Sequence, residues 1–271
     1  MALETARGAV VRGTEALGRG TARSVEMIGH WGVLAGESVF WMLAGAKLRQ
    51  PIRLREVVRQ MMEVGIFAIP IVAMLSATIG VMLAVQGIYS LRAFGAESQV
   101  VFGIALSVVR EFAPLITGIL VAGRSGSAFA ARLSTMQINQ EIDALRVIGI
   151  NPVRYLVAPA LIGMVLMVPS LTFLADLIAL YAAGVYVTVD LGISQAAYWS
   201  QVVNALSVGD LGHGLGKSAI FAVLITLIGA VNGASVSGGA EGVGRMTTRA
   251  VVQSISAIVV TDMLFVLLVT G

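Results

Sequence analysis

Two adjacent charged residues, Arg110 and Glu111, lie inside an apolar stretch that covers residues 99–123. Ionisable side chains at membrane depth are costly and usually functional. Pro114 follows them, and because proline has no N–H group, the carbonyl group of Arg110 loses its helical hydrogen-bond partner. A charge and a freed carbonyl group at one level of a span must face protein, water or a polar ligand.

The pair has two possible roles. The guanidinium of Arg110 suits a phosphate because it stays charged and can donate two parallel hydrogen bonds to oxygen atoms. Glu111 points about 100° away around a helix, so it faces another direction. Alternatively, both charges hold helices together, with Asp176 or Asp262 as partners. The residues alone leave both interpretations open.

The composition is that of a membrane protein. The chain is 57% hydrophobic and 12% charged, against roughly 25% charged residues in an average soluble domain. A span needs about 20 apolar residues to cross about 30 Å of hydrocarbon. Such windows fall at residues 64–89, 99–123, 155–184, 217–236 and 250–270. We therefore expect an all-α polytopic fold with five transmembrane helices, forming a single domain over residues 1–271.

The basic residues predict the orientation. Most of the 18 Lys and Arg residues precede Val64 or lie in the second and fourth inter-span loops. The positive-inside rule then places the N-terminus in the cytoplasm and Gly271 on the periplasmic side. Residues 1–62 mix apolar and charged positions and include Trp31 and Trp41. This pattern predicts amphipathic helices at the cytoplasmic interface, although a soluble tail has a similar composition.

Residues 137–149 follow the second window as a polar segment with helical spacing of apolar positions. Ile138, Ile142, Leu145 and Ile148 can share one face, and Pro152 enforces a stop. We predict a short cytoplasmic amphipathic helix here.

Two histidines far apart and no cysteine give no metal-binding pattern.

The remaining spans predict packing. Gly229 and Gly233 have the GxxxG spacing that allows close helix approach. We expect Asp176 and Asp262 to make helix contacts rather than to relay protons. Met82 and Leu83 either line an apolar cavity or simply face lipid or core.

Residues 212–218 end like a phosphate-binding loop, but the chain has Leu211 where the pattern needs glycine, and no strand precedes it. We therefore expect no ATP hydrolysis by this chain alone.

Four gapless stretches resemble the signature motifs of the MlaE/YrbE permeases: residues 109–115 (VREFAPL), 122–128 (AGRSGSA), 141–152 (EIDALRVIGINP) and 242–252 (GVGRMTTRAVV). The resemblance implies a permease subunit of an ABC transporter in the bacterial inner membrane. It implies transport of phospholipids between that membrane and periplasmic or outer-membrane carriers, which maintains lipid asymmetry. The implied partners are a second copy of the chain, a cytoplasmic ATPase dimer that binds the ATP, and periplasmic MCE-domain subunits. A STAS-domain subunit accompanies some members; the chain needs no cofactor of its own and no nucleic acid.

The resemblance also suggests roles for residues. The substrate path would include Arg110, Glu111, Pro114, Met82 and Leu83. The helix at 137–149 would be the coupling helix that contacts the ATPase, through Gln140, Glu141, Asp143, Leu145 and Arg146. A cytoplasmic loop motif would comprise Arg245, Thr247, Thr248 and Arg249.

A different class of protein, an ion- or proton-coupled secondary carrier, could use Arg110, Glu111, Asp176 and Asp262. Five spans without an evident inverted repeat count against a carrier. An intramembrane lipid-modifying enzyme would need a catalytic cluster, and the sequence shows no plausible one.

Overall fold

The computed structural model describes residues 29, 32–34, 36–38, 40–41 and 53–270. Within these residues the regular elements are all helical, and five helical runs are long and apolar enough to cross a membrane. The runs are Leu54–Arg92, Glu97–Ile138, Val153–Leu191, Val208–Ala234 and Gly239–Leu268. The predicted all-α fold with five spans is confirmed.

The first span begins with an amphipathic helix. α2 (Leu54–Val64) buries Val57, Gln60 and Val64 on one face and exposes its other faces. The short 3₁₀ segment η1 (Ile66–Ala68) joins it to α3 (Ile69–Arg92). Pro70 lies in the first turn of α3, where its missing N–H group costs no helical hydrogen bond.

The second span is interrupted twice by π-helical turns. Such turns insert an extra residue into a helix and are frequent at functional sites. Along the chain its segments are η2 (Glu97–Gln99), α4 (Val100–Ser107), η3 (Val108–Phe112), α5 (Ala113–Val121), η4 (Ala122–Gly126) and α6 (Ser127–Ile138). The third span starts with another π turn, η5 (Val153–Val157), and each of the three π turns in the described residues contains an arginine.

The rest of the chain forms three long helices and two short ones. These are α7 (Glu141–Val147), α8 (Ala158–Leu191), α9 (Gln195–Ala205), α10 (Val208–Ala234) and α11 (Gly239–Thr270). Ser207 begins α10 with a capping box: its hydroxyl accepts from the Asp210 N–H, and the Asp210 carboxylate accepts from the Ser207 N–H. This cap fixes the Asp210 side chain at the first turn of the helix.

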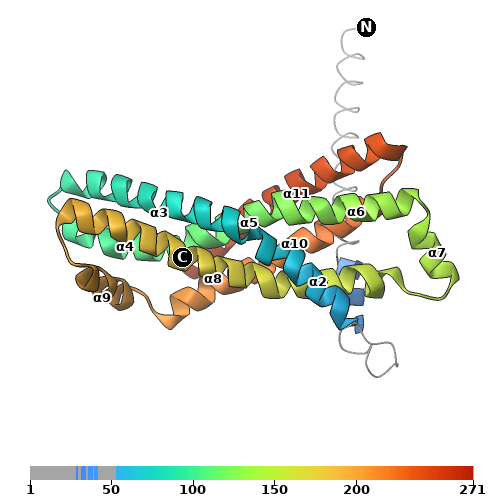
Figure 1. Cartoon of the computed structure of the whole chain (residues 1–271), viewed down its shortest axis with the longest axis horizontal. Coiled ribbons are helices and arrows are strands. Elements are labelled where there is room, and N and C mark those ends of the chain that lie inside the picture. Colours follow the sequence, from blue (N-terminus) through green and yellow to red (C-terminus); the bar gives the residue numbers. More distant parts are fainter. Residues whose placement is uncertain (1–28, 30–31, 35, 39, 42–52, 271) are drawn as a thin grey trace, which may run out of the picture.

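The helices form an elongated bundle (Figure 1). α9 and the junction of α3 with α4 lie at one end of the long axis, the α9 end, and α7 lies at the other, the α7 end. α8 packs against α3, α2 and α10. Only 11% of the apolar window of α11 is buried, against 61% for α10, so α10 is central and α11 is peripheral.

The segment around α7 differs from the prediction. The helix expected over residues 137–149 is interrupted, because Asn139 ends α6 and Gln140 adopts a left-handed conformation with φ 59°. α7 begins only at Glu141, and Gly149 closes it with φ 78°. The expected shared apolar face is therefore not formed: Ile142 is buried, but Ile148 is exposed.

The predicted interfacial region 1–62 lies largely outside the described residues. The described positions between 29 and 41 are helical. They contact the start of the third span: the Asn151 amide donates to the Glu37 carboxylate at 2.7 Å, and the Arg154 guanidinium lies 5.5 Å from the centre of the Trp41 ring.

Candidate functional site

A lysine lies at the centre of the bundle. Lys217 is part of α10, and its side chain has 0% exposure. A buried ammonium group must be paired or lose its charge. Lys217 is paired twice: Nζ donates to Glu111 Oε2 at 2.7 Å and lies 2.9 Å from Asp262 Oδ1.

These two ion pairs connect three spans. Glu111 belongs to the π turn η3 of the second span, Lys217 to α10 and Asp262 to α11. Removing one member of a buried ion pair leaves an uncompensated charge and typically costs about 3–5 kcal/mol. Lys217 therefore fixes the register of the peripheral helix α11 against the rest of the bundle.

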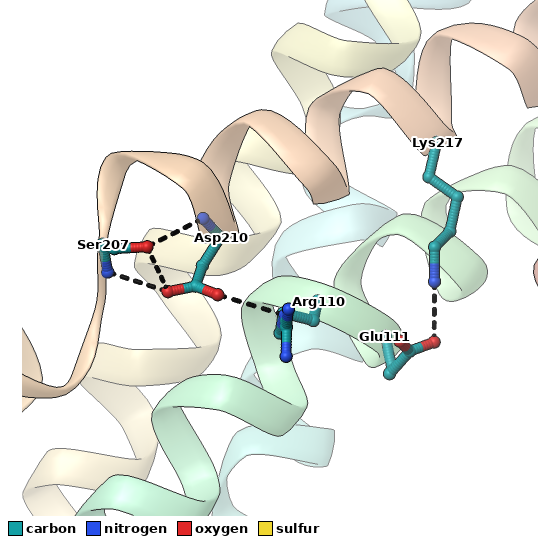
Figure 2. Close-up of polar contacts among 5 residues, drawn as sticks. All are labelled: Arg110, Glu111, Ser207, Asp210 and Lys217. Carbon is teal, nitrogen blue, oxygen red and sulfur yellow. Dashed lines mark hydrogen bonds and ion pairs between the residues drawn. The ribbon is translucent and has the colours of Figure 1, made fainter. Parts of the chain in front are cut away.

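A third ion pair lies next to the Lys217–Glu111 pair (Figure 2). Arg110 Nε lies 3.1 Å from Asp210 Oδ1, although the N–H is not aligned with that oxygen as in a hydrogen bond. The other oxygen of Asp210 accepts from the hydroxyl and the N–H of Ser207, at 2.7 and 2.8 Å. Figure 2 shows Arg110 and Glu111 reaching different parts of α10, as expected for adjacent helical residues.

Close contact between the second span and α10 brings Arg110 and Glu111 to their partners on α10. A Cβ atom at Gly214 would collide with the carbonyl oxygen of Val109 and lie 3.3 Å from Pro114 Cγ. Only glycine permits this approach of the two backbones. The glycine-rich stretch that resembles a phosphate-binding loop is thus a helix–helix contact.

We call Arg110, Glu111, Asp210, Lys217 and Asp262 the central charge cluster. It contains two cations and three carboxylates, so carboxylates are in excess. Arg110 remains 33% exposed, and its two terminal Nη groups have no hydrogen bond with any described residue. The cluster can therefore hold three spans together while presenting one edge of a guanidinium to a passing polar group.

The structure separates the other predicted site residues. Asp176 is buried in α8, and its Oδ1 has no hydrogen-bond partner in the described part of the chain. Of the two partners considered for the Arg110–Glu111 pair, Asp176 forms no ion pair among the described residues. Asp262 does join the cluster, but through Lys217, and the aspartate that pairs with Arg110 is Asp210.

The predicted path residues on α3 diverge. Leu83 lines an apolar cavity of about 260 Å³ between α3 and α4, together with Gly87 and Gly103. Met82 is exposed on the outside of the bundle. The two neighbours therefore cannot line the same space. Pro114 is buried where it faces α10, as its distance to Gly214 requires.

The predicted glycine pair lies in α10 on the side that faces α6. A Cβ atom at Gly229 would lie 3.2 Å from the Phe129 ring, and one at Gly233 would lie 2.6 Å from Leu133 Cβ. Both glycines therefore occupy a close helix contact, where a larger side chain would separate α10 from α6.

The predicted coupling residues are on the surface at the α7 end. Glu141, Asp143 and Arg146 are exposed, and Arg146 Nη1 lies 2.8 Å from Asp143 Oδ1. The Glu141 carboxylate accepts from the Asn139 amide at 3.2 Å. Gln140 is the left-handed residue before α7, and Leu145 is half-buried.

The predicted loop motif is helical. Arg245, Thr247, Thr248 and Arg249 lie in the first turns of α11. The turn before α11 ends at Gly238 and Gly239, both with positive φ, so α11 begins earlier than the polarity of this stretch suggests. Thr247 and Thr248 hydroxyls donate to the carbonyl groups of Val243 and Gly244, four residues earlier.

Two members of the cluster, Asp210 and Lys217, are not predicted from the sequence. Lys217 resembles a boundary residue, because the apolar window starts there. α10 in fact begins at Val208. Its first turns contain glycine and polar residues, so they fall outside the apolar window. The serine three residues before Asp210 is a helix-start signal that could have located this boundary.

The sequence matches a known protein family. The family described as Permease MlaE matches residues 57–268. The chain belongs to the MlaE permease family.

Relatives cover most of this MlaE-family chain. A probable ABC transporter permease protein of Rickettsia conorii is 33% identical over 251 residues, covering 92% of this chain and 94% of its own. The intermembrane phospholipid transport system permease protein MlaE of Haemophilus influenzae is 31% identical over 237 residues, covering 85% and 90%. The chloroplastic protein TRIGALACTOSYLDIACYLGLYCEROL 1 of Arabidopsis thaliana is 33% identical over 230 residues, covering 85% and 64%.

The matched region, residues 57–268, contains both the central charge cluster and α7 of this MlaE-family chain. The match thus extends over all five spans and does not rest on one motif.

Proposed function

We propose that this chain is the membrane subunit of an ABC transporter that moves phospholipids, with ATP hydrolysed by a separate cytoplasmic subunit. The family and the name of the Haemophilus influenzae relative support a phospholipid substrate. The names of the relatives as ABC transporter permeases support an ATP-driven system over an ion-coupled carrier.

One observation carries the proposal for the substrate. Arg110 lies within a membrane span, is held by Asp210 through Nε, and keeps its Nη groups without partners among the described residues. Guanidinium groups bind phosphate oxygens through such paired N–H groups. The excess of carboxylates in the cluster weakens this binding, so a lipid phosphate can pass Arg110 without being retained.

The exposed face of α11 supports a homodimer. Large apolar side chains cover it, including Val252, Val260, Met263, Leu264 and Leu267. A second copy of the chain is the occupant we propose, because a symmetric pair of permeases would match a pair of ATPases. Lys217 would then position the dimer contact, since it holds α11 in place.

The α7 end is the side we propose for the ATPase. The charges of α7 are exposed there, and next to them Val147 and Ile148 are 87% and 67% exposed. Charged residues beside an exposed apolar patch are typical of a protein interface. Arg124, Arg132, Arg146 and Arg154 lie toward this end, and the positive-inside rule makes it cytoplasmic. The α9 end then faces the periplasm, where MCE-domain subunits would receive or deliver lipid.

Reconstitution tests the proposal directly. The complex with the cognate ATPase is placed in vesicles that contain a fluorescent phospholipid, and lipid transfer is followed with and without ATP. We expect ATP-dependent transfer that ionophores do not change, and no ATP hydrolysis by the permease alone. A matched control uses an ATPase that binds but does not hydrolyse ATP. Transfer that requires an ion gradient instead of ATP would refute the proposal.

A further inference from the structure

A cavity separate from the central charge cluster lies between α2 and the second span. Its volume is about 400 Å³, and its lining includes Gln60, Glu63, Phe67, Arg124, Phe129 and Arg132. We call it the α2–α6 pocket. Arg124 belongs to the π turn η4, and Arg132 lies two turns further along α6.

The pocket lies at a different membrane depth from the cluster. Arg124 follows Arg110 by 14 residues, which corresponds to about 21 Å of helix rise toward the α7 end. The hydrocarbon core is about 30 Å thick. If Arg110 lies near its middle, the pocket is at the level of the lipid headgroups on the α7 side.

The two arginines of the pocket donate hydrogen bonds to neutral oxygens. Arg124 Nη1 donates to the carbonyl oxygen of Glu63 at 3.0 Å. With its amide oxygen turned toward Arg132, Gln60 accepts from Nη1 and Nη2 at 2.9 and 2.7 Å. The Arg132 Nε is buried and has no hydrogen-bond partner within the described part of the chain. Among the described residues, neither guanidinium has a carboxylate oxygen within hydrogen-bond distance.

Glu63 is the carboxylate in the pocket lining, and it is shared. Its Oε2 lies 3.7 Å from Arg132 Nη1, and its Oε1 lies 3.8 Å from Arg59 Nε. Both distances exceed those of charge-assisted hydrogen bonds. The lining thus contains two arginines and one half-exposed glutamate, so the pocket has a positive charge excess.

The other walls include two phenylalanine rings. The Phe67 side chain is 61% exposed, and Phe129 stacks under Arg132, with 5.6 Å between its ring centre and the guanidinium carbon. A positive group beside exposed apolar surface suits a ligand with a phosphate and a hydrocarbon tail.

We infer that the α2–α6 pocket binds the phosphate of a membrane phospholipid in the leaflet at the α7 end. The two guanidinium groups hold the phosphodiester, and Phe67 contacts the glycerol and the first acyl carbons. This site deepens the proposed function, on which its identity as a substrate site rests. A phosphodiester in bulk solution shares the charge but lacks the apolar part.

Binding is tested on the purified full-length chain in detergent. Phosphatidylglycerol is titrated and bound lipid is counted by native mass spectrometry for the wild type and for Arg124→Gln with Arg132→Gln. We expect the double variant to bind about tenfold more weakly or worse, because two charge-assisted contacts are lost. Arg55→Gln is the matched control: Arg55 is exposed on the same helix α2, outside the pocket, and should not change binding.

Two further arms decide the source of the phosphate and guard against misfolding. Inorganic phosphate and glycerol phosphate are added as competitors at millimolar concentration; displacement of the lipid by either would show a site for a soluble anion and overturn the inference. A phospholipid with a photoreactive headgroup is crosslinked to the wild type, and labels should map to residues 60–67 or 124–132. Labelling elsewhere, or equal lipid binding by the folded double variant, also overturns it.

Transport is measured separately from binding. If the wild-type complex fails to transfer phospholipid but binding still depends on Arg124 and Arg132, the proposed function fails and the lipid site stands. If transfer is ATP-dependent and binding ignores both arginines, only the lipid site fails.

Discussion

The central charge cluster and the α2–α6 pocket place arginines from two π turns of the same membrane helix in opposite electrostatic settings. In the cluster, Arg110 and Lys217 are the two cations beside three carboxylates, and Lys217 is fully buried between two of those carboxylates. Arg132 has one carboxylate at 3.7 Å, that of Glu63, which also lies 3.8 Å from Arg59. Arg124 and Arg132 donate their hydrogen bonds to neutral oxygens.

This difference indicates different tasks. A cluster with excess negative charge and a buried lysine is suited to fixing helices, and it binds a phosphate only weakly. A pocket with excess positive charge at headgroup level is suited to retaining one. A lipid would then be held at the α7 end and would meet Arg110 only in passage, about 21 Å further along the span.

The largest effect is expected from Lys217→Met. This change leaves Glu111 and Asp262 without their cation, and we expect the protein to lose about 3 kcal/mol or more of stability. The measurement is denaturation of the purified protein in detergent. Adding Glu111→Gln and Asp262→Asn to the same chain should recover most of the loss, because no charge then remains unpaired; failure to recover would mean that Lys217 stabilises by packing alone.

A second change tests the α7 end without touching the membrane core. Glu141→Lys with Asp143→Lys should leave melting of the permease unchanged, because both side chains are exposed. Like-charge contacts at an interface weaken docking. We expect the cognate ATPase to be lost in co-purification, or kept without lipid-stimulated turnover. Full ATPase binding and normal transport would exclude α7 as the coupling element and favour the start of α11.

A smaller effect on stability is expected in the pocket. Arg124→Gln with Arg132→Gln should lower the stability by about 1–2 kcal/mol, because the hydrogen bonds to the Glu63 carbonyl and to Gln60 are lost while no fully buried charge is left unpaired. The same denaturation assay as for Lys217→Met measures it. A loss as large as that of Lys217→Met would show that the pocket arginines also hold helices together. It would contradict the proposed difference between the two regions.

The smallest effect is expected from Asp176→Asn. Asp176 is buried in α8, and its Oδ1 has no partner among the described residues. Because asparagine has the same shape and no charge to desolvate, we expect stability to be unchanged or slightly higher. Loss of transport with intact melting would instead assign Asp176 a role in the transport cycle.

The sequence predicts the spans because a bilayer requires long apolar helices, and it predicts that Glu111 turns away from Arg110 because of helical geometry. It does not predict the partners. Lys217 stands at the edge of an apolar window and so looks like a surface residue, yet α10 starts at Val208 and carries it into the core. Gln140 breaks the α6–α7 segment with a positive φ that non-glycine residues seldom adopt. π turns such as η4 have no strong sequence signal, so the meeting of Arg124 with α2 is visible only in three dimensions.

The most direct test of the account is Arg110→Ala, assayed for ATP-dependent phospholipid transfer and for melting of the same preparation. We predict at least about a tenfold loss of transfer, because the phosphate loses a charge-assisted contact, together with nearly wild-type melting, because Lys217 still holds the spans. Arg92→Ala is the control, since Arg92 pairs with Glu97 and Asp190 on the exposed surface at the α9 end. Normal transfer by Arg110→Ala would contradict the account, and lost transfer with a strongly lowered melting temperature would make Arg110 a helix lock instead of a lipid contact.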